Sequence, residues 1–199
     1  MDIFQIAFLV ISYLIAAIPF GLVVSKLFAR KDIRKHGSKN IGATNVTRVL
    51  GKRLGLITLI LDGLKGAAMV FLAKSIFVIS EVDLFLVLVA AFAVIGHVYP
   101  VYLKFNGGKG VATAIATLIA LSPFIGAIVC LYWLVIFFFF RIVSIASIIS
   151  VVCSIGLAII LHLEPSLILF CTFLSFIIVL RHKENISRLL AGEENGFKK

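Results

Sequence analysis

The chain has 199 residues, of which 62% are hydrophobic and only 14% are charged, and its mean hydropathy is +1.18. A soluble globular protein needs far more charge to cover its surface, so this composition excludes that class and indicates that lipid solvates most of the chain. The 19 Lys and Arg residues against 9 Asp and Glu residues give a net charge of +10. In a membrane protein such an excess reports on orientation in the bilayer, so it does not favour a nucleic-acid binder.

Stretches without charged residues predict the membrane spans, taken in chain order. They are residues 3–25, 84–103, 111–140, 142–163 and 165–180, and a sixth stretch, 54–80, is interrupted by Asp62, Lys65 and Lys74. The N-terminal stretch lacks a basic region and a cleavage motif, so we expect a retained span and not a signal peptide.

Residues 111–140 form a stretch too long for one crossing, because about 20 residues span a bilayer. It breaks at Ser122-Pro123 into a short helix, 111–121, and a full span, 123–140. The sequence therefore predicts an all-α integral membrane protein. We expect about seven transmembrane helical segments in one bundle, one of them short, with residues 1–199 forming a single domain.

The basic residues predict the orientation of these spans. With the N-terminus outside, nearly all of them face the cytoplasm, including the basic stretch 26–53, Arg141 and the C-terminal Lys198 and Lys199. The outer side then receives acidic residues such as Asp2 and Glu164. The positive-inside rule therefore predicts an outer N-terminus and a cytoplasmic C-terminus.

The first polar segment is the predicted loop 36–48, HGSKNIGATNVTR. Its glycines, hydroxyls, amides and terminal Arg48 are groups that bind a phosphate through backbone N–H groups, hydroxyl donors and a guanidinium fork. An ordinary solvated loop with capping residues and charges for lipid headgroups explains the segment equally well.

The second polar segment is 105–110, FNGGKG, immediately before the predicted short helix. Glycines let the backbone approach a ligand closely, and the first N–H groups of a helix are unpaired and carry a positive dipole. We therefore favour a phosphate site, with Lys109 adding charge, over a flexible turn. The spacing of a Walker A loop is absent, so ATP hydrolysis has no support.

Two further clusters contain charged or histidine side chains. Asp62 and Lys65 share a helix face within a span, where they either contact substrate or hold helices together. His97 precedes the glycine-rich segment and is a candidate donor or base, or a hydrogen-bonded histidine of the bundle. In 181–186, RHKENI, His182 and Asn185 share a face, whereas we interpret Arg181 as a headgroup anchor.

Several chemistries lack their signatures. The cysteines Cys130, Cys153 and Cys171 lie in apolar runs, and no Cys/His cluster or H-E-x-x-H pattern is present, so we expect neither a metal site nor disulfides. There is no G-x-S-x-G elbow and no His-x-x-x-x-Asp pattern of the acyltransferases that use thioester donors.

These segments, in this order and in a chain of this length, closely resemble the bacterial acyl-phosphate:glycerol-3-phosphate acyltransferase family. The matching segments are IPFG at 18–21, GSKNIGATN at 37–45 with Arg48, DGLKG at 62–66, GHVYP at 96–100 leading into 105–113, and RHKENI at 181–186. The resemblance covers essentially the whole chain.

The resemblance implies a seven-helix enzyme of the bacterial inner membrane with its active site on the cytoplasmic side. Such enzymes transfer a fatty acyl group from acyl phosphate to the 1-hydroxyl of sn-glycerol-3-phosphate. The products are lysophosphatidate and inorganic phosphate, in the first step of phospholipid biosynthesis. It further implies no cofactor, a monomer in membrane lipid, no nucleic-acid partner, and a functional link to a soluble enzyme that makes acyl phosphate.

By the same resemblance, Gly107, Gly108 and Gly110 would hold the phosphate of acyl phosphate. Ser38, Arg48 and Lys109 would hold that of glycerol-3-phosphate, and His182 and Asn185 would place its hydroxyls. The remaining expected substrate-binding residues are Asn40, Thr44, Asn45, Asp62 and Lys65, and the expected catalytic residues are His97, Lys109 and His182.

An acyl phosphate is a mixed anhydride whose leaving group departs without protonation, so the site must supply charge stabilisation and alignment. The base for the attacking hydroxyl is His97, His182 or the phosphate of the substrate, and the sequence does not choose among them. A second hypothesis is an anion or phosphate-ester transporter, and a third is a lipid-binding scaffold. Lys39 stands where the family usually has Gly, which puts in doubt any role that needs a positive φ there.

Overall fold

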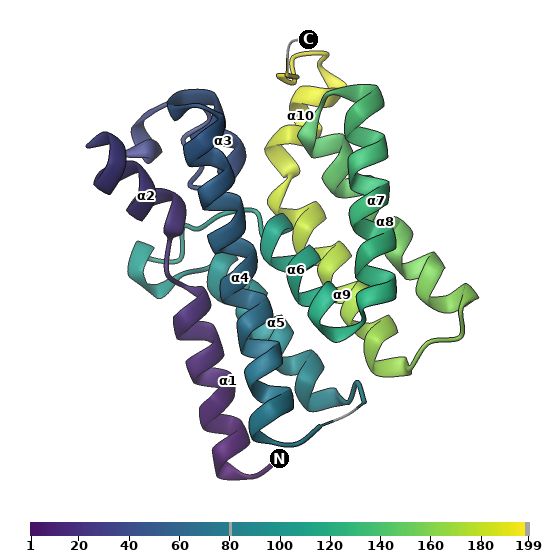
Figure 1. Ribbon diagram of the computed structural model, residues 1–199. Coiled ribbons are helices and arrows are strands. Elements are labelled where there is room, and N and C mark those ends of the chain that lie inside the picture. The colour runs from purple at the N-terminus through teal and green to yellow at the C-terminus, as the bar shows by residue number, and fades with distance from the viewer. Residues whose placement is uncertain (80, 198–199) are drawn as a thin grey trace.

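The computed structural model describes residues 1–79 and 81–197, which fold almost entirely into helices (Figure 1). The helices are α1 (Ile3–Ala16), α2 (Phe20–Ala29), α3 (Ala43–Leu50), α4 (Lys52–Ile76), α5 (Leu84–Val98), α6 (Val111–Leu121), α7 (Pro123–Phe140), α8 (Val143–Ile160), α9 (Pro165–Arg181) and α10 (Lys183–Leu190), with 3₁₀ turns η1 (Ile33–Lys35) and η2 (Val101–Leu103). The predicted all-helical class is confirmed. Ser80 of the predicted span 54–80, and Lys198 and Lys199, lie outside the described residues.

Most of the predicted spans correspond to long apolar helices. Within residues 1–79 and 81–197, five segments are long and apolar enough to cross a membrane, namely Ile3–Ala29, Lys52–Ile76, Leu84–Leu103, Pro123–Phe140 and Val143–Ile160. α9 and α10 together make a sixth, although the chain bends by 62° between them. α6 has only 11 residues, as the break at Ser122-Pro123 predicts.

The first predicted span, 3–25, corresponds to the candidate span Ile3–Ala29, but its helix is broken in the middle. It is interrupted after Ala16, and α2 begins only after Pro19, which has no backbone N–H to donate. The break leaves the carbonyl of Ile18 outside any helix, where it accepts from the Phe20 N–H at 3.1 Å and from Lys65 Nζ of α4 at 2.9 Å. A charged side chain in the bundle thus satisfies a backbone group that lipid cannot.

Two short polar helices lie outside the predicted spans. The predicted loop 36–48 is shorter than expected, because residues 43–50 form α3, which packs on α4. After Arg181 the chain bends and continues as α10. Both helices are amphipathic, with polar residues on one face.

The last carbonyls of the short helix α6 accept hydrogen bonds from a lysine of α4. Lys74 Nζ of α4 donates to the carbonyls of Ala120 at 2.7 Å and Leu121 at 3.3 Å. The last carbonyls of a helix lack intrahelical donors, so this lysine supplies one where the chain turns from α6 into α7.

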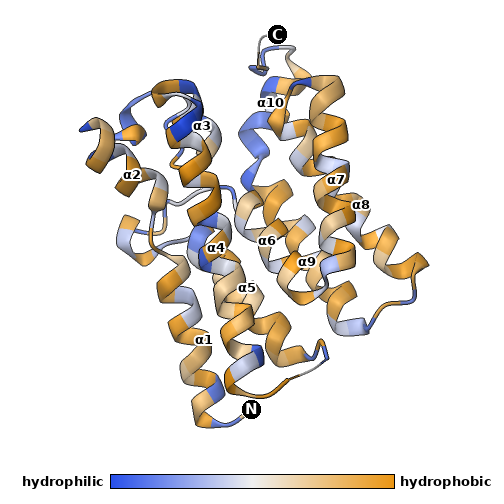
Figure 2. Cartoon of the chain, viewed as in Figure 1, coloured by the Kyte–Doolittle hydropathy of each residue, from blue (hydrophilic) through white to orange (hydrophobic). Residues whose placement is uncertain are grey.

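The two ends of the helix bundle differ in polarity. The N- and C-termini lie at opposite ends, and α2, α3 and α10 gather at the end where the C-terminus lies (Figure 1). Hydrophilic residues concentrate at that same end, and a further hydrophilic patch lies within α4 (Figure 2). The helices also enclose a buried apolar core, which includes Leu86, Leu118, Phe170 and Ile178. The polar end is therefore where the candidate site residues must be sought.

Candidate active site

A buried ionic cluster lies where α4 meets α5. Lys65 Nζ is 3.0 Å from Asp62 Oδ1, and His97 Nδ1 is 3.5 Å from the same oxygen. The side chains of Asp62 and Lys65 are each 2% exposed and that of His97 is 4% exposed. Because Lys65 also binds the carbonyl of Ile18, the cluster joins α4 to α5 and to the break between α1 and α2. In this structure Asp62 and Lys65 hold helices together.

The glycine-rich segment folds against His97. The N–H of Gly108 donates to the His97 carbonyl at 3.1 Å, and that of Gly107 donates to the Val98 carbonyl at 3.2 Å. A Cβ at Gly107 would overlap the His97 carbonyl, and a Cβ at Gly108 would overlap His97 Nε2. Gly110 has φ +87°, which favours glycine.

These contacts limit what the glycine-rich segment can offer a phosphate. The predicted phosphate-binding role of Gly107 and Gly108 cannot use their own N–H groups, because both are engaged within the protein. Packing against His97 is what requires glycine at these positions. The donors that remain for an anion are the first N–H groups of α6, which begins at Val111.

Arg181, for which the sequence predicts a headgroup anchor, supports the same segment. Its Nη2 donates to the Gly107 carbonyl at 3.2 Å and its Nε to the Gly108 carbonyl at 3.3 Å. Its guanidinium lies over the Tyr99 ring, 5.4 Å from the ring centre. Gly107 and Gly108 are buried and lie outside any helix, so their carbonyls need such donors, and only the fold reveals which arginine supplies them.

Lys109 points to the C-terminal part of the chain. Its Nζ donates to Asn185 Oδ1, and Asn185 Nδ2 donates to Glu194 Oε1. Glu194 also accepts from Arg188 Nε at 2.7 Å and Ser144 Oγ at 2.9 Å. Burial lowers the pKa of Lys109 from 10.5 to about 8.

Glu194 is a site residue that the sequence analysis missed. Its side chain is only 7% exposed, although its neighbours in the C-terminal segment are exposed. Burial acts to raise the pKa of this carboxyl, but the hydrogen bonds from Asn185, Arg188 and Ser144 together bring the pKa below its usual value. No local motif marks this residue, because its partners come from two separate helices, α8 and α10.

His182 lies buried at the junction of α9 and α10. Its Nδ1 is 2.8 Å from the Ile178 carbonyl, so the hydrogen-bond network assigns the Nδ1 proton to that contact. The neutral ring then keeps a lone pair on Nε2, which is the atom able to accept a proton. Asn185 follows three residues later, within the first turn of α10.

Asn45 organises the loop that precedes α3. Its Nδ2 donates to the carbonyls of Asn40 at 2.8 Å, His36 at 3.0 Å and Ile33 at 3.3 Å, and its Oδ1 accepts from the Ser38 N–H at 2.9 Å. The side chain is 1% exposed. The Asn45 amide therefore stabilises the fold of the loop.

The rest of that loop is turned and mostly exposed. Asn40 Oδ1 accepts from the Gly42 N–H at 2.8 Å, and Lys39 has φ +59°. Position 39 therefore does adopt the left-handed conformation that glycine favours, with lysine in its place. Ser38 is exposed and Thr44 is half-buried at the start of α3.

Arg48 reaches from α3 to the C-terminal segment. Its Nη2 donates to the Asn195 carbonyl at 2.7 Å, and its guanidinium lies 5.1 Å from the centre of the Phe197 ring. Because Asn195 follows Glu194, this contact brings Arg48 beside the Lys109–Asn185 pair. The positive charges of Arg48 and Arg188 also contribute to lowering the pKa of Lys109.

The structure thus divides the predicted residues into two groups. Arg48, Lys109, His182 and Asn185 gather around the C-terminal segment, whereas Asp62, Lys65 and His97 form the buried support beneath the glycine-rich segment. Among residues 1–79 and 81–197, no three His, Cys, Asp or Glu side chains cluster as a metal site would require.

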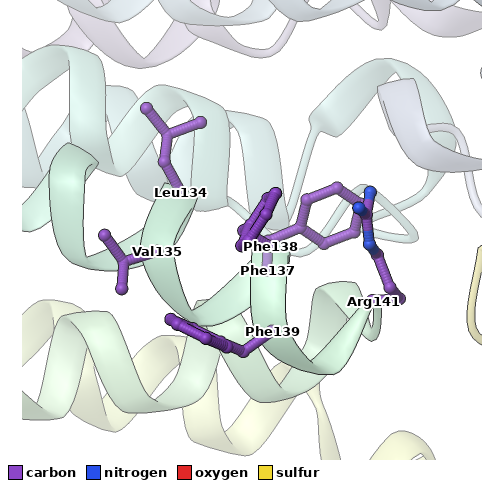
Figure 3. A pocket seen from close by; sticks show the side chains of 6 residues that line it. All are labelled: Leu134, Val135, Phe137, Phe138, Phe139 and Arg141. Atoms are coloured by element: carbon purple, nitrogen blue, oxygen red, sulfur yellow. The ribbon is translucent and has the colours of Figure 1, made fainter.

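An apolar groove of about 400 Å³ lies along α7, near the C-terminal segment. Figure 3 shows its lining, which ends at Arg141 and consists of Leu134, Val135, Phe137, Phe138, Phe139 and Arg141. The Arg141 guanidinium lies 5.2 Å from the centre of the Phe138 ring. A cation at the end of an apolar surface is typical of a helix that meets lipid headgroups.

Comparisons with known proteins agree with this geometry. The model of the glycerol-3-phosphate acyltransferase family matches residues 6–192. A glycerol-3-phosphate acyltransferase of Syntrophotalea carbinolica is 47% identical over 192 residues, which cover 96% of each chain. One from Ehrlichia canis is 43% identical over 187 residues, covering 94% of this chain and 95% of the relative.

Solved structures give the same result. The crystal structure of PlsY (YgiH), an integral membrane glycerol 3-phosphate acyltransferase, in its glycerol 3-phosphate form has a TM-score of 0.91 and 38% identity. The alignment covers 98% of this chain and 96% of that one. Its lysophosphatidic acid form has a TM-score of 0.89 and 37% identity, covering 98% of this chain and 95% of that one.

Proposed function

Because the chain belongs to the glycerol-3-phosphate acyltransferase family, we propose that it transfers a fatty acyl group from acyl phosphate to the 1-hydroxyl of sn-glycerol-3-phosphate. The products are 1-acylglycerol-3-phosphate, or lysophosphatidate, and inorganic phosphate. This reaction is the first step of phospholipid biosynthesis. A transporter is not favoured, because the matched relatives are named as acyltransferases.

One observation supports the chemistry most directly. Lys109 and Arg48, which are far apart in the sequence, lie at one polar site together with the amide of Asn185. Two phosphates must be held together in this reaction, and cations with fixed donors stabilise the charge on them. The acyl phosphate is already activated, so alignment of hydroxyl and carbonyl is the remaining requirement.

We assign the residue roles from these positions together with the family resemblance. The start of α6, with Gly110 and Lys109, holds the phosphate of acyl phosphate by its N–H groups and positive dipole. Ser38, Arg48 and Lys109 hold the phosphate of glycerol-3-phosphate, with Asn40 and Thr44 beside Ser38. Asn185 orients the glycerol hydroxyls.

His182 is the base that the geometry favours. Its Nδ1 is occupied by the Ile178 carbonyl, so Nε2 of the neutral ring accepts the proton of the attacking hydroxyl. The ring of His97 is 4% exposed and its Nε2 faces Gly108, which favours a supporting role for that residue. Asp62, Lys65 and Asn45 likewise support the site without contacting substrate.

The membrane arrangement completes the proposal. Residues 1–199 form one membrane-embedded domain of seven helical segments in the bacterial inner membrane, with the N-terminus outside and both the C-terminus and the active site in the cytoplasm. The enzyme acts as a monomer, without a cofactor, and receives its acyl phosphate from a soluble enzyme. A cysteine in place of Asp2 should then react with an impermeant maleimide in intact cells, and one in place of Lys35 only after lysis.

The donor is tested with purified protein in detergent. Palmitoyl phosphate and glycerol-3-phosphate should give lysophosphatidate and an equal amount of phosphate, whereas palmitoyl thioesters of coenzyme A or acyl carrier protein should give none. Product from the thioesters alone would overturn the proposed donor.

A further inference from the structure

Residues 195–197, which follow Glu194, contact Arg48 of α3 on one side and the end of α7 on the other. The Phe197 N–H donates to the Arg141 carbonyl at 2.9 Å, and the Phe197 ring meets the Phe137 ring edge to face, with centres 5.9 Å apart. The segment is therefore fastened to the end of α7 on one side.

On its other side, the same segment holds a side chain from α3. Arg48 lies over the Phe197 ring at 5.1 Å and donates to the Asn195 carbonyl at 2.7 Å. Arg48 is otherwise exposed, and α3 packs chiefly on α4. The two contacts thus join α3 to α7 through a single guanidinium.

From this geometry we propose that Phe197 is a positioning residue that orients Arg48 for binding the phosphate of glycerol-3-phosphate. The inference rests on the proposed function, in which Arg48 is a ligand of that phosphate.

The chemistry of the guanidinium explains why an aromatic ring suits this task. A cation over a ring is held through its flat face, which leaves the N–H groups at its edge available. One of these edges is used by the Asn195 carbonyl, which fixes rotation within the plane. The remaining donors then point in a fixed direction and can bind two phosphate oxygens at once. A long side chain without the ring would have to lose its rotamer freedom at each binding event.

A segment that blocked the site would have the opposite effect on the binding of glycerol-3-phosphate. If the segment blocked the site, loosening Phe197 would make glycerol-3-phosphate bind more tightly. If Phe197 positions Arg48, loosening it weakens binding while the chemical step keeps its rate. The Michaelis constant for glycerol-3-phosphate therefore distinguishes the two by its direction.

The test compares three full-length variants at saturating palmitoyl phosphate. Phe197→Leu keeps apolar bulk but removes the ring, Phe197→Tyr keeps the ring, and Phe124→Leu makes the same change on an exposed phenylalanine at the far end of α7. Phe197→Leu should raise KM for glycerol-3-phosphate about fivefold with kcat within about twofold. Phe197→Tyr and Phe124→Leu should both stay within about twofold of the wild type.

Combining the change with Arg48→Lys tests whether the effect passes through the arginine. In that background Phe197→Leu should change KM by less than about twofold, because the stacked planar group is already gone. A lower or unchanged KM in Phe197→Leu, an equal rise in Phe197→Tyr, or an undiminished effect beside Arg48→Lys would overturn the inference.

A binding measurement separates this inference from the proposed function. The dissociation constant of glycerol-3-phosphate, followed by the shift in melting temperature, should weaken in Phe197→Leu by the same factor as KM. An active wild type whose Phe197→Leu variant binds glycerol-3-phosphate as tightly would overturn the positioning role alone. A wild type with no acyl transfer would overturn the proposed function and the inference together.

Discussion

The imidazole of His97 lies directly against the backbone of Gly108, so that a Cβ at position 108 would overlap His97 Nε2. Since the Gly108 N–H also donates to the His97 carbonyl, helix α5 and the glycine-rich segment are joined twice at this point. The ion pair of Asp62 and Lys65 lies on the other side of the imidazole. The shape of the glycine-rich segment therefore depends on its contact with His97, which is supported in turn by Asp62 and Lys65.

Replacing Gly108 by alanine should lower the free energy of unfolding by about 3 kcal/mol, because the added methyl group must displace His97. Gly156→Ala is the matched control. It lies within α8 with no atom within 4 Å of the added Cβ, so it should be neutral or stabilising by up to about 1 kcal/mol. Thermal unfolding in detergent measures both. Equal melting temperatures for Gly108→Ala and the wild type would contradict the packing described here.

Lys65→Met should strongly destabilise the protein, by about 3–5 kcal/mol, because it leaves the carboxylate of Asp62 buried without its cation. Adding Asp62→Leu removes the stranded charge, so the double variant should recover much of the lost melting temperature. A double variant less stable than Lys65→Met would show that the two side chains do not act as a pair.

The sequence predicts the helices far better than the contacts at the site. Apolar runs about 20 residues long and the Ser122-Pro123 break are local features, so α4 to α9 follow from them. Pro19 is equally visible, but the cost of interrupting a span there is offset by Lys65, which lies far along the chain. A local sequence pattern does not predict such an interaction between residues that are far apart in the chain.

Motifs likewise indicate which residues matter and not what they contact. The glycines of 105–110 suggest close approach to a phosphate, yet Gly107 and Gly108 are required by His97. Asn45 belongs to a motif with polar neighbours, yet its amide is engaged within the loop. Glu194 belongs to no motif used in the prediction and became visible only when its partners were brought together by the fold.

Lys39→Gly should stabilise the protein by about 0.5–1 kcal/mol, because Lys39 has φ +59° and glycine adopts this conformation without a steric penalty. Lys39→Ala removes the same charge but keeps the Cβ, so it should give no such gain. The difference in melting temperature between the two variants isolates the backbone effect. A gain of equal size in Lys39→Ala would attribute it to charge.

The binding of glycerol-3-phosphate should weaken at alkaline pH. Burial lowers the pKa of Lys109 to about 8, so its ammonium is charged below that pH and loses its proton as the pH rises through it. kcat/KM for glycerol-3-phosphate should therefore fall above about pH 8. Lys109→Arg, which stays charged, should move this fall to higher pH even if its rate is lower. An unchanged alkaline limb in Lys109→Arg would assign it to another group.

The rate of lysophosphatidate formation from palmitoyl phosphate and glycerol-3-phosphate, measured side by side for the wild type and Lys109→Ala, tests the central claim most directly. We predict a turnover in the wild type that falls about 100-fold in Lys109→Ala, with the melting temperature preserved. No product from the wild type, or near wild-type turnover in the variant, would contradict the assignment of this site to acyl transfer.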